Sequence, residues 1–262
     1  MSIEVPIAVS GLELVLSCVE KLYKERNLKH VRMVRRVDLG SAALSVVKRF
    51  TACTHLHTEL FSLQIPDESG FGVEGCAHLG KLNSMTALHF GARNQITGDA
   101  CRWLRPCSEL TNLHIGDENH MGPEGCAALQ RLPSLTHIHV GDDNDIGPDG
   151  CRELGAKREL KFLHIGDRNR IGPSGCNGLH YLRNLLCLHI GANNDIGEGG
   201  YRKLRILPQL SSLHIGKDNG IDRQKAEQID LDLQQKGDQF TIFAPTDGAP
   251  GELSRLRHFE IE

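Results

Sequence analysis

Histidine is the residue type whose spacing in this 262-residue sequence most clearly suggests chemistry. Six histidines recur at intervals of 25 residues, at His89, His114, His139, His164, His189 and His214. Imidazole binds transition metals, exchanges protons near neutral pH and forms hydrogen bonds through its ring edge. A regular series of imidazoles therefore predicts one surface on which the rings are aligned. The relative orientation of the rings determines whether that surface can bind a metal, exchange protons or contact a partner.

Three interpretations of the histidine series remain open. In the first, histidine is copied with the repeating unit and the stacked rings satisfy one another, with no further function. In the second, the rings form a flat recognition surface for an extended or basic segment of another protein. In the third, neighbouring pairs bind Zn, Ni or Cu, although a linear series offers many equivalent poor sites and no convergent one.

The second interpretation defines a candidate partner-binding surface that is wider than the histidines. Three positions after a histidine come Asp117, Asp142 and Asp167, which would form an acidic stripe. Two positions before a histidine come His137 and Phe162, which could anchor a partner side chain. If the rings are stacked on parallel strands about 4.8 Å apart, they should resist charging together. We therefore expect a neutral series at pH 7 with anticooperative protonation.

Cysteine follows the same 25-residue spacing, at Cys76, Cys101, Cys126, Cys151 and Cys176. On an inward helix face cysteine behaves as a small hydrophobic residue. Five thiols in a row cannot all pair, and the sequence contains no C-x-x-C metal or redox motif. This pattern favours a reducing intracellular compartment, cytoplasmic or nuclear.

The remaining motifs do not favour an enzyme, and no cofactor is predicted. No G-x-S-x-G, H-E-x-x-H, P-loop or Rossmann fingerprint is present. The glycine-rich stretch GDxNxIGPxG recurs in every unit, which favours tight turns over phosphate binding. No apolar run is long enough for a membrane span, and the N-terminus lacks the basic region of a secretory signal.

The charge balance gives a second partner hypothesis. A formal net charge of −3 does not favour general nucleic-acid binding. However, residues 21–36 carry a basic run that includes Arg32, Arg35 and Arg36. An RNA-associated factor that uses this run is therefore an alternative to a protein-binding scaffold, and a solvated basic surface is the simpler reading.

All of these residues are positioned by one repeating unit. The stretch LTNLHIGDENHMGPEGCAALQRLPS, residues 110–134, has counterparts that begin at residues 60, 85, 135, 160, 185 and 210. Apolar residues at positions 1, 4 and 6 of the unit predict a strand. Asparagine follows at position 10, and Gly-Pro then opens a short helix with an apolar face.

The pattern LxxLxIGxxNxIGxxGCxxLxxL resembles the leucine-rich repeat of the helix-containing kind. The resemblance covers residues 34–221, as a degenerate first repeat followed by seven units. It implies an α/β solenoid, or horseshoe, with a parallel sheet on the concave face and short helices on the convex face. It also implies a buried ladder of the position-10 asparagines and a role as a protein–protein interaction scaffold.

The ends of the chain lie outside the repeat register and are predicted to be caps. Residues 1–33 are expected to form a helical N-terminal cap, with a helix over residues 11–26. Residues 222–262 are expected to form a small C-terminal cap, with a helix over residues 222–235 and strands over residues 239–244 and 255–261.

Overall fold

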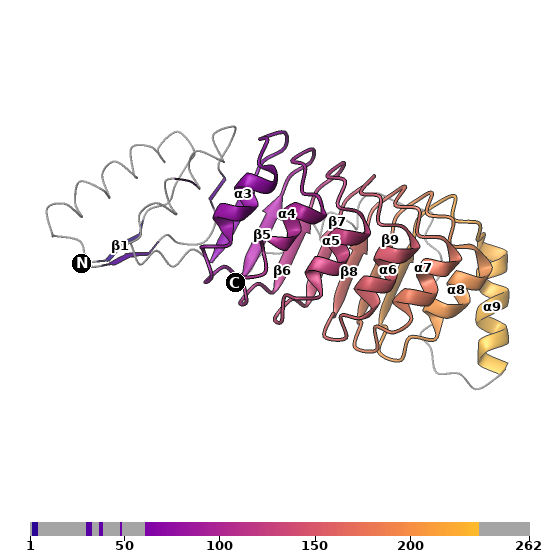
Figure 1. The fold of residues 1–262 in the computed structure, drawn as a ribbon. Helices are drawn as coiled ribbons and strands as arrows, with labels where there is room; N and C mark the ends of the chain where they lie inside the picture. The colour runs from indigo at the N-terminus through magenta and orange to yellow at the C-terminus, as the bar shows by residue number, and fades with distance from the viewer. Residues whose placement is uncertain (1, 5–29, 33–36, 39–47, 49–60, 236–262) are drawn as a thin grey trace, which may run out of the picture.

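A computed structural model of the chain describes residues 2–4, 30–32, 37–38, 48 and 61–235. Within residues 61–221, units of 25 residues each contribute one strand and one turn, and all but the last add a helix, so that successive units stack along one axis (Figure 1). This confirms the predicted repeat architecture. The helix expected over residues 11–26 and the strands expected after residue 238 lie outside the described residues.

Eight of the described strands form one parallel sheet in which sequence order equals spatial order. Its members are β3 (Val37–Asp38), β4 (Ser62–Ile65), β5 (Ala87–Phe90), β6 (Asn112–Ile115), β7 (His137–Val140), β8 (Phe162–Ile165), β9 (Cys187–Ile190) and β10 (Ser212–Ile215). The register pairs equivalent positions of neighbouring units, so that His114 lies beside His139 and Leu113 beside Ile138. Identical side chains therefore align across the sheet.

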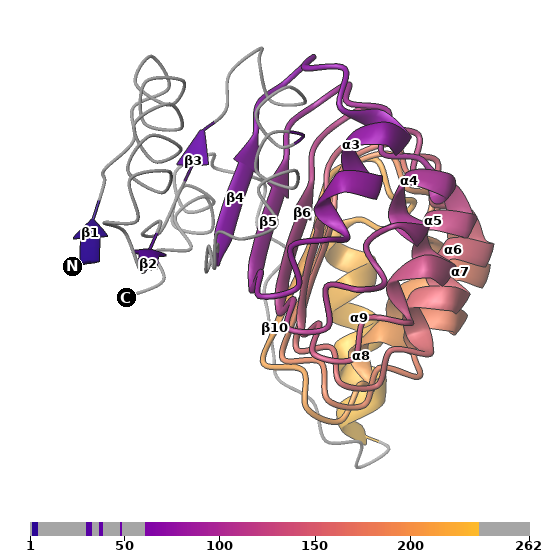
Figure 2. The ribbon, with the colours of Figure 1, turned by 60° about the vertical axis from the view of Figure 1, so that its left-hand side comes forward.

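The helices lie side by side on one face of this sheet (Figures 1 and 2). They are α3 (Gly72–Leu79), α4 (Gly98–Arg102), α5 (Gly122–Leu129), α6 (Gly147–Gly155), α7 (Gly172–Leu179) and α8 (Gly197–Arg205). Pro123, Pro148 and Pro173 occupy the first turns of α5, α6 and α7, as the Gly-Pro pattern predicts.

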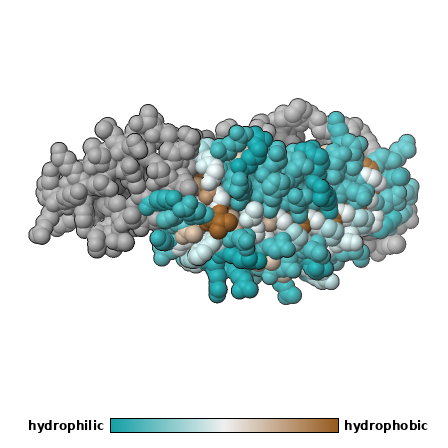
Figure 3. Space-filling model, turned by 45° about the horizontal axis from the view of Figure 1, so that its top comes forward, coloured by the Kyte–Doolittle hydropathy of each residue, from teal (hydrophilic) through white to brown (hydrophobic). Residues whose placement is uncertain are grey.

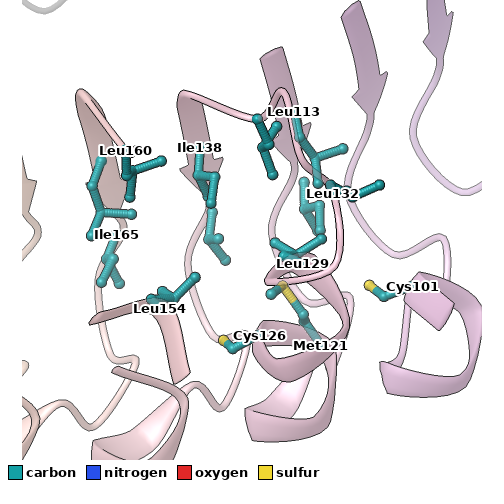
Figure 4. Packing of buried hydrophobic residues seen from close by; sticks show 14 of the residues in the cluster. Cys101, Leu113, Met121, Cys126, Leu129, Leu132, Ile138, Leu154, Leu160 and Ile165 are labelled. Carbon is teal, nitrogen blue, oxygen red and sulfur yellow. The ribbon is translucent and has the colours of Figure 1, made fainter. Parts of the chain in front are cut away.

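The core fills the space between the sheet and the helices. In Figure 4, Leu113 and Ile138 of the strands face Leu129 and Leu154 of the helices, and all four belong to one buried cluster. The position-17 cysteines lie in this core as free thiols. Burial raises the pKa of Cys101 to about 12, so this thiol is inert at neutral pH.

The asparagine ladder is confirmed in the turns that follow the strands. Asn94, Asn119, Asn144, Asn169, Asn194 and Asn219 are fully buried. The side-chain oxygen of Asn144 accepts a hydrogen bond from the backbone N–H of Asn119 at 3.0 Å. Its amide nitrogen donates to the carbonyl of Gly116 at 2.9 Å. Each amide therefore joins its own turn to the turn of the preceding unit.

The N-terminal region differs from a purely helical cap where it is described. The segments β1 (Ser2–Glu4) and β2 (His30–Arg32) form a parallel pair of strands. This pair is a two-stranded sheet of its own, distinct from the eight-stranded sheet. The sequence prediction missed them because three-residue strands leave no clear periodicity.

A longer helix, α9 (Arg223–Gln235), closes the C-terminal end of the repeats. It matches the predicted helix, and the Asp222 side chain accepts a hydrogen bond from the Lys225 N–H at 2.8 Å, as an N-cap does. Ala226 and Ile229 of α9 pack on Tyr201 of α8. No helix in the described part of the chain combines the length and apolarity needed to cross a membrane.

Candidate functional site

The six histidines form one continuous stack, which we call the histidine column: His89, His114, His139, His164, His189 and His214. Centroids of consecutive rings lie 3.9, 4.0, 4.0, 4.1 and 4.3 Å apart, with interplanar angles between 5° and 18°. The column lies on the sheet face opposite the helices, because position 5 alternates with the core positions 4 and 6. The predicted stack is present, but its spacing is shorter than the 4.8 Å expected from the strands.

The geometry of the column does not suit a metal site. The ring nitrogen lone pairs lie in nearly parallel planes about 4 Å apart, so those of neighbouring rings do not meet at one point, as metal ligands must. No group of three or more His, Cys, Asp or Glu residues that could hold a metal ion occurs among the described residues. The metal interpretation therefore gains no support from this face.

Burial in the stack lowers the pKa of the central imidazoles. The pKa of His114 falls to about 3, chiefly because burial disfavours the charged ring and secondarily because His89 and His164 would repel it. The same causes lower the pKa of His164 to about 3 and that of His189 to about 2. These three rings are therefore neutral at pH 7, in agreement with the expectation for this part of the column.

We expect acid to destabilise the fold through these rings. Below pH 6.5 the unfolded chain binds protons on His114, His164 and His189 while the folded chain keeps them neutral. Stability should therefore fall between about pH 6 and pH 4, by about 1 kcal/mol per histidine and pH unit. Urea denaturation at several pH values measures this slope.

A glutamine variant isolates the contribution of the column to that slope. Gln64 occupies the equivalent position of the first described unit and pairs with His89 in register, so glutamine fits the sheet. The variant His114→Gln plus His164→Gln should show a clearly shallower fall in stability with acid. An unchanged slope would mean that the stack does not resist protonation.

His137 and Phe162 lie next to the column and are stacked on each other. Their centroids are 4.4 Å apart with an interplanar angle of 14°. Both are partly exposed, and the ring nitrogen Nδ1 of His137 lies 2.8 Å from the hydroxyl of Thr136. The structure therefore places this predicted pair beside His139 and His164 on the same face.

The aspartates predicted as a recognition stripe have a structural role. One carboxylate oxygen of Asp117 accepts the backbone N–H of Asp142 at 2.9 Å, and Asp142 accepts that of Asp167 at 2.8 Å. Asp167 in turn accepts the N–H of Ala192 at 2.7 Å. The aspartates form a second ladder between units, and each keeps its other oxygen for further contacts.

The glycines before these aspartates allow the units to approach. A Cβ on Gly141 would lie 2.2 Å from an oxygen of Asp117 and 2.8 Å from backbone atoms of the preceding unit. The equivalent positions in the other units are equally crowded. Glycine at position 7 is therefore required by stacking, and it does not leave backbone open for a ligand.

A row of charges beside the aspartates was not predicted. Arg168 lies 2.7 Å from Asp143 and 3.4 Å from Asp142, and Arg93 forms ion pairs with Glu68 and Glu118. These residues occupy position 9 of successive units, or position 8 in the case of Asp142, and they are exposed or half-buried. The acidic stripe is thus partly neutralised from within the chain, and only the three-dimensional stacking could show this.

Comparison with protein-family models and with curated proteins finds no match for this chain. The assignment of a function must therefore depend on the site itself. The described face offers a row of stacked imidazoles, a stacked His–Phe pair and partly compensated carboxylates. Such a surface can form hydrogen bonds and flat contacts.

Proposed function

We propose that this chain is a leucine-rich-repeat scaffold without catalytic activity, and that it binds an extended segment of a protein partner on its histidine face. The 25-residue strand–helix unit and the asparagine ladder support the family assignment. The observation that carries the binding proposal is the histidine column itself. Its rings are held in one stack, and all but His189 keep part of their surface exposed.

The ring spacing supports a concave histidine face. Strands in a sheet are about 4.8 Å apart, whereas the rings that they carry are 3.9 to 4.3 Å apart. Side chains converge in this way on the inner side of a curved sheet. A concave face of stacked strands is the surface on which solenoid proteins receive extended partners.

The charges refine the expected partner. Arg168 contacts Asp142 and Asp167, whereas Asp117 forms no ion pair with a described residue. A basic side chain of the partner would therefore meet Asp117 first. The partner residues next to that basic side chain would lie on the histidine column and on the His137–Phe162 pair. The flat aromatic rings there offer the largest contact area.

The test compares two double variants in affinity purification followed by mass spectrometry. The variant His139→Ala plus His164→Ala removes the centre of the column, and a specific partner should be reduced at least tenfold. The control variant His120→Ala plus His180→Ala removes two histidines that lie outside the column, and it should retain the partner. Retention of every partner by the column variant would refute the proposal.

A folding control separates lost binding from lost structure. The variant His139→Gln plus His164→Gln keeps a hydrogen-bonding side chain of the type found at Gln64. It should fold with the same circular dichroism spectrum as the unmodified protein and still lose affinity for the purified partner. Full affinity in this variant would show that the imidazole rings are not the contact surface.

A further inference from the structure

The turns that follow the helices carry exposed positive charge. One exposed basic residue occurs in each of five consecutive turns: Lys81, Arg105, Arg131, Arg158 and Arg183. None of these side chains forms an ion pair or hydrogen bond with a residue that the structure describes. Because the units stack in register, the five turns follow one edge of the solenoid, which we call the basic edge.

The opposite edge, formed by the turns after the strands, is different. There Arg93, Arg168 and Arg170 are all engaged with carboxylates of neighbouring units. In the turns of the basic edge the acidic residues are Glu109 and Glu159, and Glu159 lies 3.9 Å from the ammonium of Lys157. The net charge of the chain is −3, yet the exposed charge is unevenly distributed. Positive charge remains on the basic edge, whereas the arginines of the opposite edge are paired with carboxylates.

Exposed aromatic rings accompany this positive charge. Trp103 and Tyr181 are 50% and 60% exposed, and they are the large aromatic side chains that stand out from the described surface. Each precedes an arginine of the basic edge by two residues. A Cβ on Gly80 would lie 2.6 Å from the carbonyl oxygen of Trp103, so Trp103 adjoins the turn that carries Lys81.

A shallow cleft lies at one end of the basic edge. It has a volume of about 350 Å³ and is lined by Arg158, Tyr181, Arg183 and Asn184. The Asn184 amide donates to the carbonyl of Arg158 at 2.9 Å, which ties the two turns together. The cleft therefore combines two guanidinium groups, which have no ion pair with a described residue, with a phenol ring. The described surface that faces the viewer in Figure 3 is mostly hydrophilic.

We propose that the basic edge binds single-stranded nucleic acid. Sequence-tolerant binding of single strands combines a track of Lys and Arg for the phosphates with aromatic side chains on which bases stack. The basic edge supplies both, with Trp103 near one end and Tyr181 near the other. An acidic peptide would use the charges but would leave the two aromatic rings without a stacking partner.

Fluorescence anisotropy with a labelled 15-nucleotide oligo(U) tests the electrostatic part. The variant Arg131→Gln, Arg158→Gln plus Arg183→Gln should weaken binding at least tenfold. It should also reduce the slope of log affinity against log salt by about 2, because each phosphate contact on a single strand contributes about 0.7. The matched control Arg93→Gln, Arg168→Gln plus Arg170→Gln makes the same charge change on the opposite edge and should keep the affinity. Equal losses in the two variants would overturn the proposal.

The stacking of bases on Trp103 and Tyr181 is tested by separate measurements. Trp103 is the only tryptophan of the chain, so tryptophan fluorescence reports on this side chain alone. That fluorescence should be quenched when oligo(U) binds. Tyr181→Leu should weaken binding about 5- to 100-fold.

Oligo(dT) should bind comparably if the 2′-hydroxyl is not read, and weaker oligo(dT) binding would identify RNA as the ligand. A polyglutamate of equal length that binds as tightly, or oligo(U) binding with neither quenching nor sensitivity to Tyr181→Leu, would refute a nucleic-acid site. The histidine column lies on another surface, so this outcome is independent of the protein-partner proposal.

Discussion

Replacing Asn144 with alanine is expected to lower the free energy of unfolding by about 3 kcal/mol. The side chain is fully buried and lies in the middle of the asparagine ladder. Its oxygen accepts the N–H of Asn119, and its nitrogen donates to the carbonyls of Gly116 and Asp142. Removal leaves a buried N–H without its acceptor and weakens two carbonyl contacts, and each such buried group costs about 1–3 kcal/mol.

Urea denaturation followed by circular dichroism measures this loss, and Asn83→Ala is the matched control. Asn83 is exposed in a turn after a helix, so its replacement should change stability by no more than about 0.5 kcal/mol. A loss below about 1 kcal/mol for Asn144→Ala would indicate that water enters the turn and replaces the amide. The ladder would then guide register without contributing much stability.

The sequence was sufficient to predict the repeating unit and the alignment of its side chains. A strict 25-residue period allows few solutions other than stacked units, and alternation around Leu113, His114 and Ile115 assigns the histidine to the face opposite the core. The asparagine ladder is what the resemblance to leucine-rich repeats implies, and it agrees with the rule that a buried amide must be paired. These predictions depend on local periodicity and on polar satisfaction, both of which can be read along the chain.

The spacing of the histidine rings and the pairing of the position-8 carboxylates could not be predicted from the sequence. Both depend on the curvature of the sheet and on the contacts between stacked units. The spacing of about 4.8 Å was taken from flat strands, whereas the rings converge to about 4 Å. The sequence predicts the aspartates at position 8 as a recognition stripe, and it gives no signal that they also accept backbone N–H groups of the next unit. The 2.9 Å contact of Asp117 with the next unit shows this additional role.

The left-handed backbone conformation in the turns after the strands also could not be predicted from the sequence. Arg168 and Arg170 have φ values of 53° and 56°, in the left-handed region where glycine is usually expected. The hydrogen bonds of Asn169 between them hold the turn in this conformation. Arg168 in this turn pairs with Asp142 and Asp143 of the preceding unit, so the charge pairing on this edge depends on contacts between units.

The second large effect is expected at the C-terminal end, where Asp230→Ala should cost about 3–5 kcal/mol. Arg205 of α8 is almost fully buried, and its Nε donates to Asp230 of α9 at 2.7 Å. The hydroxyl of Tyr201 lies 3.3 Å from the same carboxylate. Without Asp230 the guanidinium would keep its charge in a buried position without its main counter-ion, and α9 should separate from the last repeat.

Two further variants distinguish the cost of a buried charge from the value of the pair. Asp232→Ala disrupts the neighbouring Arg202–Asp232 pair, which joins the same helices at 3.3 Å but is partly exposed, and it should cost less than about 1 kcal/mol. The double variant Arg205→Met plus Asp230→Leu removes both buried charges and should recover most of the stability lost in Asp230→Ala. Hydrogen exchange of the α9 amides gives the local readout, with fast exchange in Asp230→Ala and near-normal protection in the double variant. If the double variant is as unstable as the single one, the ion pair itself, and not the desolvated guanidinium, determines how tightly α9 closes the repeats.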